Sequence, residues 1–139
     1  MMKKRDKYGF RYRDWDVYQD ARVFRSEMIN LVKTFPESER FELVSQTKRA
    51  LNSILLNIAE GANRKTDKDT RLFIGYAKSS LDEVVACLDC ALDDDYVTEE
   101  YHDKYLTKAS SLGKRLTAFS NYLGKVCTRK EVKDCINDN

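Results

Sequence analysis

Apolar residues recur at spacings of three and four along four long segments of the chain, over about residues 14–34, 37–61, 67–93 and 98–124. This spacing places one apolar stripe along one face of an α-helix. The four stripes comprise Val17, Ala21, Phe24, Met28 and Leu31, then Val44, Thr47, Leu51, Ile54 and Ile58, then Ile74, Ala77, Leu81, Val84, Leu88 and Leu92, and finally Leu106, Ala109, Leu112, Leu116, Phe119 and Leu123. The pattern therefore predicts four helices, each with one buried face.

Residues that end or begin helices lie between these segments. The Phe35–Pro36 step ends the first helix, because proline disfavours a helical conformation in the residue before it. Gly61 is placed to cap the end of the second helix, Thr66 or Asp67 to cap the start of the third, and Thr98 to begin the fourth. Short connections between long helices favour antiparallel neighbours. The predicted fold class is all-α, an up-down-up-down four-helix bundle with coiled-coil-like spacing.

Composition agrees with this organisation. The 139 residues fit one domain, and 5 glycines with 1 proline offer few of the turns that many short strands need. We divide the chain into an N-terminal arm over 1–13, the bundle over 14–124 and a C-terminal tail over 125–139. No apolar run approaches the ~20 residues of a transmembrane helix, and no apolar segment follows the basic N-terminus as in a secretory signal. We expect a cytoplasmic protein with no membrane partner.

Charge is distributed unevenly, although the net charge is only +2. Residues 1–13, 64–78 and 104–139 carry +5, +3 and +5, whereas residues 14–63 and 79–103 carry −2 and −9. These poles could be ordinary solvated surface, or the acidic strip Asp82 to Asp103 could meet the basic surface of another copy head to tail. Within that strip the run Asp93 to Asp95 falls at a helix end, where its charge opposes the helix dipole. We expect the run to be frayed, or bound to cations or to a neighbour.

Basic residues around the junction of the second and third helices could hold phosphate groups. The candidates for nucleic-acid binding are Arg49, Arg64, Lys65, Lys68, Arg71 and Lys78. The arm from Lys7 to Trp15 interleaves basic and aromatic residues, a composition that suits base stacking and neutralisation of a phosphate backbone. The same rings could instead pack on the bundle or on a neighbouring subunit, and we favour packing.

Four residues near the end of the second helix form a candidate structural motif, namely Ser53, Asn57, Glu60 and Gly61. Asn57, Glu60 and Arg64 step by four and three along the chain, so they would share one helical face. Glu60 could pair with Arg64 or with Arg71 across the turn, and Asn57 could satisfy a backbone group of another helix. We expect these contacts to fix the helix pair and a subunit contact, with direct ligand contact as the alternative.

The sequence offers no convergent set of acid, base, nucleophile or metal ligands, so we expect no catalytic residues, no cofactor and no metal site. Cys87 and Cys90 form a C-x-x-C, which Cys127, Cys135 and His102 could in principle complete as a zinc site. The helical periodicity around the pair, without glycine or proline, favours reduced thiols on a packed helix instead.

A longer motif runs from Ser45 to Arg64 and contains Arg49-Ala50, Ser53-Ile54 and Asn57-Ile58-Ala59-Glu60-Gly61. It resembles the hallmark of the four-helix-bundle family named for the 23S rRNA intervening-sequence protein. Phe35-Pro36 and the segment Phe73 to Glu83 resemble that family's preceding loop and third-helix signature. The resemblance covers about Asp14 to Gly124. The chain departs from it at Ser79, where the family usually has glycine, and in its two ends.

The resemblance implies a small bundle that tends to form a homopentameric ring, and it implies no enzyme. It also points to the related accessory variability proteins of diversity-generating retroelements, which bind nucleic acid and a reverse transcriptase. We therefore predict a non-enzymatic accessory protein that binds RNA or DNA as an oligomeric ring, with a reverse transcriptase as a further partner. The alternative is a protein-interaction scaffold without intrinsic nucleic-acid affinity.

Overall fold

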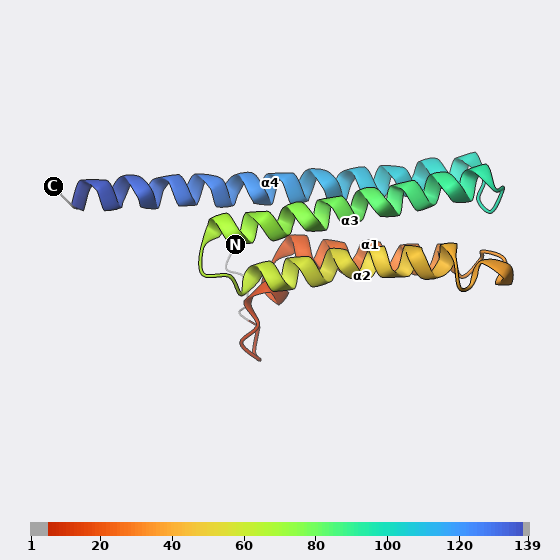
Figure 1. The fold of residues 1–139 in the computed structure, drawn as a ribbon, viewed down its shortest axis with the longest axis horizontal. Coiled ribbons are helices and arrows are strands. Elements are labelled where there is room, and N and C mark those ends of the chain that lie inside the picture. The colour runs from red at the N-terminus through yellow and green to blue at the C-terminus, as the bar shows by residue number, and fades with distance from the viewer. Residues whose placement is uncertain (1–5, 138–139) are drawn as a thin grey trace.

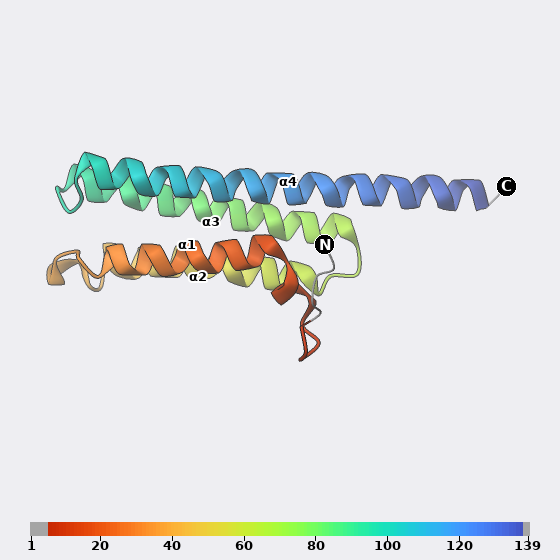
Figure 2. The same ribbon diagram turned by 180° about the vertical axis from the view of Figure 1, so that it is seen from behind.

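The computed structural model describes residues 6–137, with side chains described as far as Lys125. Its elements are the 3-10 helix η1 (Arg11–Asp14), α1 (Asp16–Val32), the 3-10 helix η2 (Glu37–Glu39), α2 (Leu43–Ala62), α3 (Asp67–Asp93) and α4 (Glu99–Asn137). The described residues contain no strand. Figures 1 and 2 show the four α-helices lying lengthwise beside one another, with successive helices running in opposite directions. No helix in the described range has a stretch both long and apolar enough to cross a bilayer.

Each α-helix packs against two others, in the pairs α1–α2, α2–α3, α3–α4 and α1–α4. This arrangement confirms the predicted up-down-up-down four-helix bundle. The predicted stripes form its core, in which Met28, Leu51, Ile74 and Leu116 are almost completely buried. Their burial removes apolar surface from water along the whole bundle, which is the main stabilising contribution to such a fold.

The seam between α1 and α4 joins the first and last helices of the bundle. Arg115 on α4 pairs with Asp20 on α1 at 2.7 Å, and Lys108 pairs with Glu27 at 2.8 Å. These ion pairs flank the buried stripe and are partly exposed. They therefore help to align α1 with α4 but add little to the free energy of unfolding.

Helix starts follow the predicted capping residues at two of the junctions. The Thr66 Oγ1 accepts a hydrogen bond from the Asp69 N–H at 3.1 Å, and α3 spans the predicted Asp67–Asp93. The Thr98 Oγ1 accepts from the Tyr101 N–H at 3.2 Å at the start of α4. The second helix, in contrast, begins at Leu43 and not at residue 37, because residues 37–39 form η2 and the Glu39 carboxylate accepts the Leu43 N–H at 3.2 Å.

The fourth helix continues past Gly124 to Asn137, so the predicted end at Gly124 is wrong. One glycine inside a helix costs only about 1 kcal/mol, which does not stop a long helix. Gly124 instead allows close contact with α3, since a Cβ there would lie 3.0 Å from the Arg71 guanidinium. Figure 1 shows α4 extending beyond the turn between α2 and α3. The side chains of Cys127 and Cys135 lie outside the described ones.

The α1–α2 and α3–α4 connections meet at one end of the bundle, which we call the acidic end. Here the Tyr96 hydroxyl donates to the Glu39 carboxylate at 2.7 Å, and the Tyr96 ring lies 5.8 Å from that of buried Phe35. The hydrogen bond to Glu39 raises the pKa of Tyr96 to about 12. The two connections are thereby tied to each other.

The run Asp93 to Asp95 does lie at a helix end, but the expectation that it is frayed is wrong. Asp95 has a φ of 61°, and its N–H bonds the Leu92 carbonyl at 3.1 Å. The Tyr96 N–H bonds the Ala91 carbonyl at 2.8 Å. These two bonds form a Schellman motif, which satisfies carbonyls at the end of α3 despite the unfavourable local charge.

Candidate nucleic-acid interface

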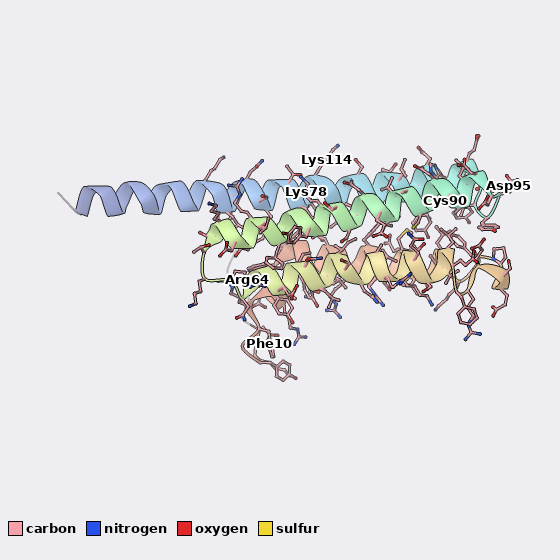
Figure 3. The ribbon with its side chains drawn as sticks, in the orientation of Figure 1. Phe10, Arg64, Lys78, Cys90, Asp95 and Lys114 are labelled. Atoms are coloured by element: carbon pink, nitrogen blue, oxygen red, sulfur yellow. The ribbon has the colours of Figure 1, made fainter. Side chains whose placement is uncertain are left out.

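The opposite end of the bundle, which we call the basic end, holds the N-terminal arm, the α2–α3 turn and the first turns of α3. Figure 3 places Arg64 and Phe10 together at this end, with Lys78 farther along α3. The arm reaches α2 because η1 packs against both α1 and α2. The basic end is therefore built from two parts of the chain that are far apart in sequence.

A close contact between α2 and α3 positions the turn. The Thr70 hydroxyl donates to the Gly61 carbonyl at 2.8 Å, and a Cβ on Gly61 would lie 2.8 Å from the Phe73 Cβ. Gly61 is a buried helical residue, and the cap of α2 is Asn63. The prediction that Gly61 caps the helix is thus wrong. Its lack of a side chain lets α2 and α3 approach closely, and it does not form a left-handed turn.

Four of the six predicted phosphate-binding residues gather at the basic end. Arg64 and Lys65 lie in the turn, Lys68 and Arg71 lie in the first turns of α3, and all four are exposed. Arg49 is also exposed but lies about 20 Å before the end of α2, by the 1.5 Å rise per helical residue. Lys78 lies about 15 Å beyond Lys68 on α3 and is half-buried. The structure therefore separates Arg49 and Lys78 from the cluster.

The predicted ion pairs of Glu60 do not form. The Arg64 guanidinium lies 4.3 Å from the centroid of the Phe73 ring, and the Arg71 Nε donates weakly to the Ser120 hydroxyl at 3.5 Å. Arg64 follows the end of α2, so it does not continue the helical face that holds Glu60. The contact of Arg64 with Phe73 was not predicted, because the sequence singles out Phe73 only as part of the segment that resembles the family's third-helix signature.

Lys65 and Lys68 differ from these two arginines. Both lysines are exposed, and neither makes a hydrogen bond or an ion pair within the described part of the chain. Their ammonium groups are thus available to an external anion. Lys65 and Lys68 together with Arg64 and Arg71 are called the basic cluster below.

Two of the four predicted motif residues, Ser53 and Asn57, take part in a hydrogen-bonded bridge between α2 and α3. The Asn57 side-chain amide donates to the Ser53 carbonyl at 2.8 Å and to the Ser53 hydroxyl at 3.1 Å. The Ser53 hydroxyl lies 2.8 Å from that of Ser80 on α3, which donates to the Tyr76 carbonyl at 3.1 Å. The prediction that Asn57 satisfies a backbone group of another helix is therefore wrong, because its amide donates to a carbonyl of its own helix. Asn57 reaches α3 through the hydroxyl groups of Ser53 and Ser80.

The described part of the arm folds around an aspartate. The Asp6 carboxylate accepts the Tyr8 and Phe10 N–H groups at 3.1 Å each and pairs with Arg13 at 3.1 Å. Gly9 within this loop has a φ of 88°, a left-handed conformation that glycine adopts without strain. The arm thus carries its cations on a folded loop.

The aromatic residues of the arm divide between packing and exposure. Trp15 packs on Phe119 with ring centroids 4.8 Å apart, and Tyr12 packs edge-on against Tyr18 at 4.9 Å. Tyr8 and Phe10 are 63% and 55% exposed. An open pocket of about 540 Å³ lies between residues 9–12 of the arm and the end of α2, with Glu60 and Asn63 on its wall. Asn63 was not predicted as a site residue, because the sequence carries no signal for the return of the arm onto α2.

The thiol and imidazole groups lie away from the basic end. Cys87 is buried on α3, and this burial raises the pKa of its thiol, whereas Cys90 on the same helix is exposed. The His102 Nε2 lies 2.8 Å from the Asp89 carboxylate and links α4 to α3. Among the described residues, no three His, Cys, Asp or Glu side chains gather in a way that could hold a metal ion.

Comparisons with known proteins agree with the fold. A family model described as 23S rRNA-intervening sequence protein matches residues 13–118. A crystal structure of a protein of unknown function from the S23 ribosomal protein family of Bacteroides thetaiotaomicron aligns with a TM-score of 0.68 and 22% identity, covering 75% of this chain and 97% of that chain. At this identity the likeness establishes the fold alone. No curated protein matches the chain.

Proposed function

Because the chain belongs to the 23S rRNA-intervening sequence protein family, we propose that it is a non-enzymatic accessory protein that binds nucleic acid, with RNA as its ligand, through the basic end. The observation that carries the proposal is the basic cluster, in which Lys65 and Lys68 have no partner within the described residues. Free ammonium groups that can displace counterions from phosphates supply most of the affinity of such proteins.

The residues of the arm support the proposal that the nucleic-acid ligand is single-stranded. Tyr8 and Phe10 offer exposed rings on which bases can stack, and Arg13 lies over the Tyr8 ring at 5.6 Å. Positive groups that follow the backbone, combined with aromatic rings, are the usual means of binding single strands without strict sequence preference. The pocket beside Phe10 is open enough to admit a base.

Assembly is the second part of the proposal. We propose that copies form a pentameric ring, in which the acidic end of one copy meets basic surface of the next. The opposite charges of the two ends support head-to-tail contacts, which close into rings when the rotation between copies permits. A reverse transcriptase is the partner protein that this ring would serve, and Leu56 and Tyr76, which are 63% and 46% exposed, offer apolar surface for docking it.

The test is binding of a single-stranded RNA oligonucleotide, measured by fluorescence anisotropy, to Lys65→Glu/Lys68→Glu. We expect at least a tenfold loss of affinity, because two attractive charges become repulsive. Lys33→Glu/Lys48→Glu makes the same charge change at exposed positions outside the basic end and should alter affinity less than twofold. Wild-type affinity should fall about twentyfold between 50 and 200 mM salt if roughly three phosphates are contacted.

Two outcomes would reject the proposal. Equal losses in the two double variants would mean that only net charge matters and that the basic cluster is no site. Negligible RNA affinity of the wild-type protein at low salt would favour the scaffold role, in which the protein binds only another protein.

A further inference from the structure

The pocket between the arm and α2 has a polar wall. Glu60 and Asn63 lie three residues apart at the end of α2, line this pocket together and are both exposed. Neither side chain makes a hydrogen bond or an ion pair within the described part of the chain. A carboxylate, which only accepts hydrogen bonds, and an amide, which also donates them, are therefore both open to a ligand in the pocket.

The remaining walls of the pocket suit a flat ring. Phe10, labelled in Figure 3, is 55% exposed, and its ring lies 6.3 Å from that of Tyr12, which packs edge-on against Tyr18. On the α2 side the pocket is lined by Ala59 and Ala62, whose short side chains leave its volume of about 540 Å³ open. A base that enters the pocket thus has an aromatic ring to stack on and space beside α2.

Glu60 brings a negative charge to the end of the molecule that we propose binds RNA. It precedes Arg64 of the basic cluster by four residues, and its charge repels the phosphates that the cluster attracts. Such a carboxylate lowers the affinity for RNA unless the bound strand donates hydrogen bonds to it. The bases carry the N–H donors of an RNA strand, so the groups that Glu60 suits belong to a base and not to the backbone.

The four bases differ in the donors and acceptors on their Watson–Crick edges. Guanine presents two adjacent donors, N1–H and N2–H, which match the two oxygens of a carboxylate. Adenine and cytosine present one amino group beside a ring nitrogen that accepts, and uracil presents one N–H between two carbonyls. Each of these three therefore places an acceptor against a carboxylate, which costs free energy because two acceptors repel each other. Guanine also presents the O6 acceptor next to N1–H, where an amide N–H satisfies it.

We propose that this pocket selectively binds a guanine base of single-stranded RNA. The Glu60 carboxylate accepts the N1–H and N2–H groups, the Asn63 amide donates to O6, and the base stacks on Phe10. The inference rests on the proposed function, because the basic cluster and the arm bring the strand to the pocket. It adds a sequence preference, which contacts to phosphates do not provide.

The first test compares RNA decamers that differ in one base. A uridine decamer is compared with decamers that carry guanosine, inosine or 7-deazaguanosine at one central position, and binding is measured by fluorescence anisotropy. The wild type should bind the guanosine decamer about tenfold more tightly than the uridine decamer. Inosine lacks only the 2-amino group and should lose about fivefold relative to guanosine, because one Glu60 oxygen is left without a donor. 7-Deazaguanosine keeps the whole Watson–Crick edge and should bind like guanosine.

Variants of the polar wall separate its two residues. Glu60→Gln replaces one acceptor with a donor, so the guanosine and inosine decamers should bind equally, while the uridine decamer is bound at least as tightly as by the wild type. Asn63→Ala should weaken guanosine and inosine by the same factor, because both bases present O6. Asp69→Asn is the matched control for the loss of charge, since Asp69 is also exposed at the basic end but lies outside the pocket. It should leave the preference for guanosine unchanged.

The second test uses a ligand without phosphate. Guanosine, as the free nucleoside at millimolar concentration, should give stronger saturation-transfer NMR signals than inosine with the wild type. Lys65→Glu/Lys68→Glu should keep this difference, because a nucleoside has no charge for the basic cluster to bind. Glu60→Gln should abolish it.

The outcomes distinguish this inference from the proposed function. Equal wild-type affinity for the guanosine, inosine and uridine decamers, or a guanosine preference that survives Glu60→Gln, would overturn the guanine pocket and leave RNA binding by Lys65 and Lys68 standing. Conversely, unchanged RNA affinity of Lys65→Glu/Lys68→Glu would reject the basic cluster, whereas a guanosine signal that depends on Glu60 would still support the pocket.

Discussion

The two ends of the bundle are held together by different contacts. At the acidic end the two connections are tied together by the Tyr96–Glu39 hydrogen bond, the Phe35–Tyr96 ring contact and the Schellman motif at Asp95. At the basic end the backbone is held by Gly61 and Thr70, while Lys65 and Lys68 are left without partners in the described chain. The acidic end is thus tied together by contacts between its two connections, whereas the basic end carries two lysines without a partner among the described residues.

The largest test of this contrast removes one aromatic ring from each end. Phe35→Ala should lower the free energy of unfolding by about 3 kcal/mol, because Phe35 is buried and its removal leaves a cavity. Phe73→Ala should cost about half as much, because that ring is only half-buried under Arg64. Urea denaturation followed by circular dichroism measures both, and a larger loss for Phe73→Ala would contradict the contrast.

Alanine substitutions at two glycines, one at the end of α2 and one in α3, should change the free energy of unfolding in opposite directions. Gly61→Ala should destabilise the protein by about 1–3 kcal/mol, because its methyl group would overlap Phe73. Gly75→Ala should stabilise an isolated copy by about 0.5–1 kcal/mol, since it faces open space and alanine favours helix. Thermal unfolding at low protein concentration measures both shifts. Stabilisation by Gly61→Ala would show that α2 and α3 are not held as closely as described.

The two helix ends also differ in backbone conformation. Asp95→Gly should stabilise the protein by up to ~1 kcal/mol, because glycine adopts a positive φ without strain. Asn63→Gly should give no gain, because the cap of α2 has an ordinary φ of −94° and glycine only adds entropy to the unfolded chain. Equal shifts in urea midpoint for the two variants would remove this distinction.

The smallest effect concerns pH. The raised pKa of Tyr96, about 12 in the folded protein against an ordinary value of 10, means that the unfolded chain loses this proton first. The stabilisation is therefore complete below pH 10 and is lost as the pH rises from 10 to 12. Tyr96→Phe should show a shallower loss of unfolding free energy in that interval. Identical pH profiles for wild type and Tyr96→Phe would mean that the hydrogen bond to Glu39 does not form.

Most of the architecture could be predicted from the sequence, because a buried stripe at helical spacing leaves few alternatives for Ile74 or Leu116. The site was less predictable. Arg64 and Glu60 are four residues apart, yet the helix ends between them, and only the close approach at Gly61 brings Phe73 under Arg64. Spacing predicts which residues share a helix face while the helix lasts, whereas contacts after its end depend on tertiary packing.

The seam between α1 and α4 has a consequence for the order of assembly. The α2–α3 hairpin joins neighbours in sequence, so its formation requires closure of only a short loop, whereas α1 and α4 meet only across the intervening hairpin. The pairs Asp20–Arg115 and Glu27–Lys108 should therefore form after the rate-limiting step. In stopped-flow experiments, Arg115→Met should accelerate unfolding and leave the refolding rate nearly unchanged. The α2–α3 hairpin would then form the folding nucleus, and the contact between α1 and α4 would close the bundle last.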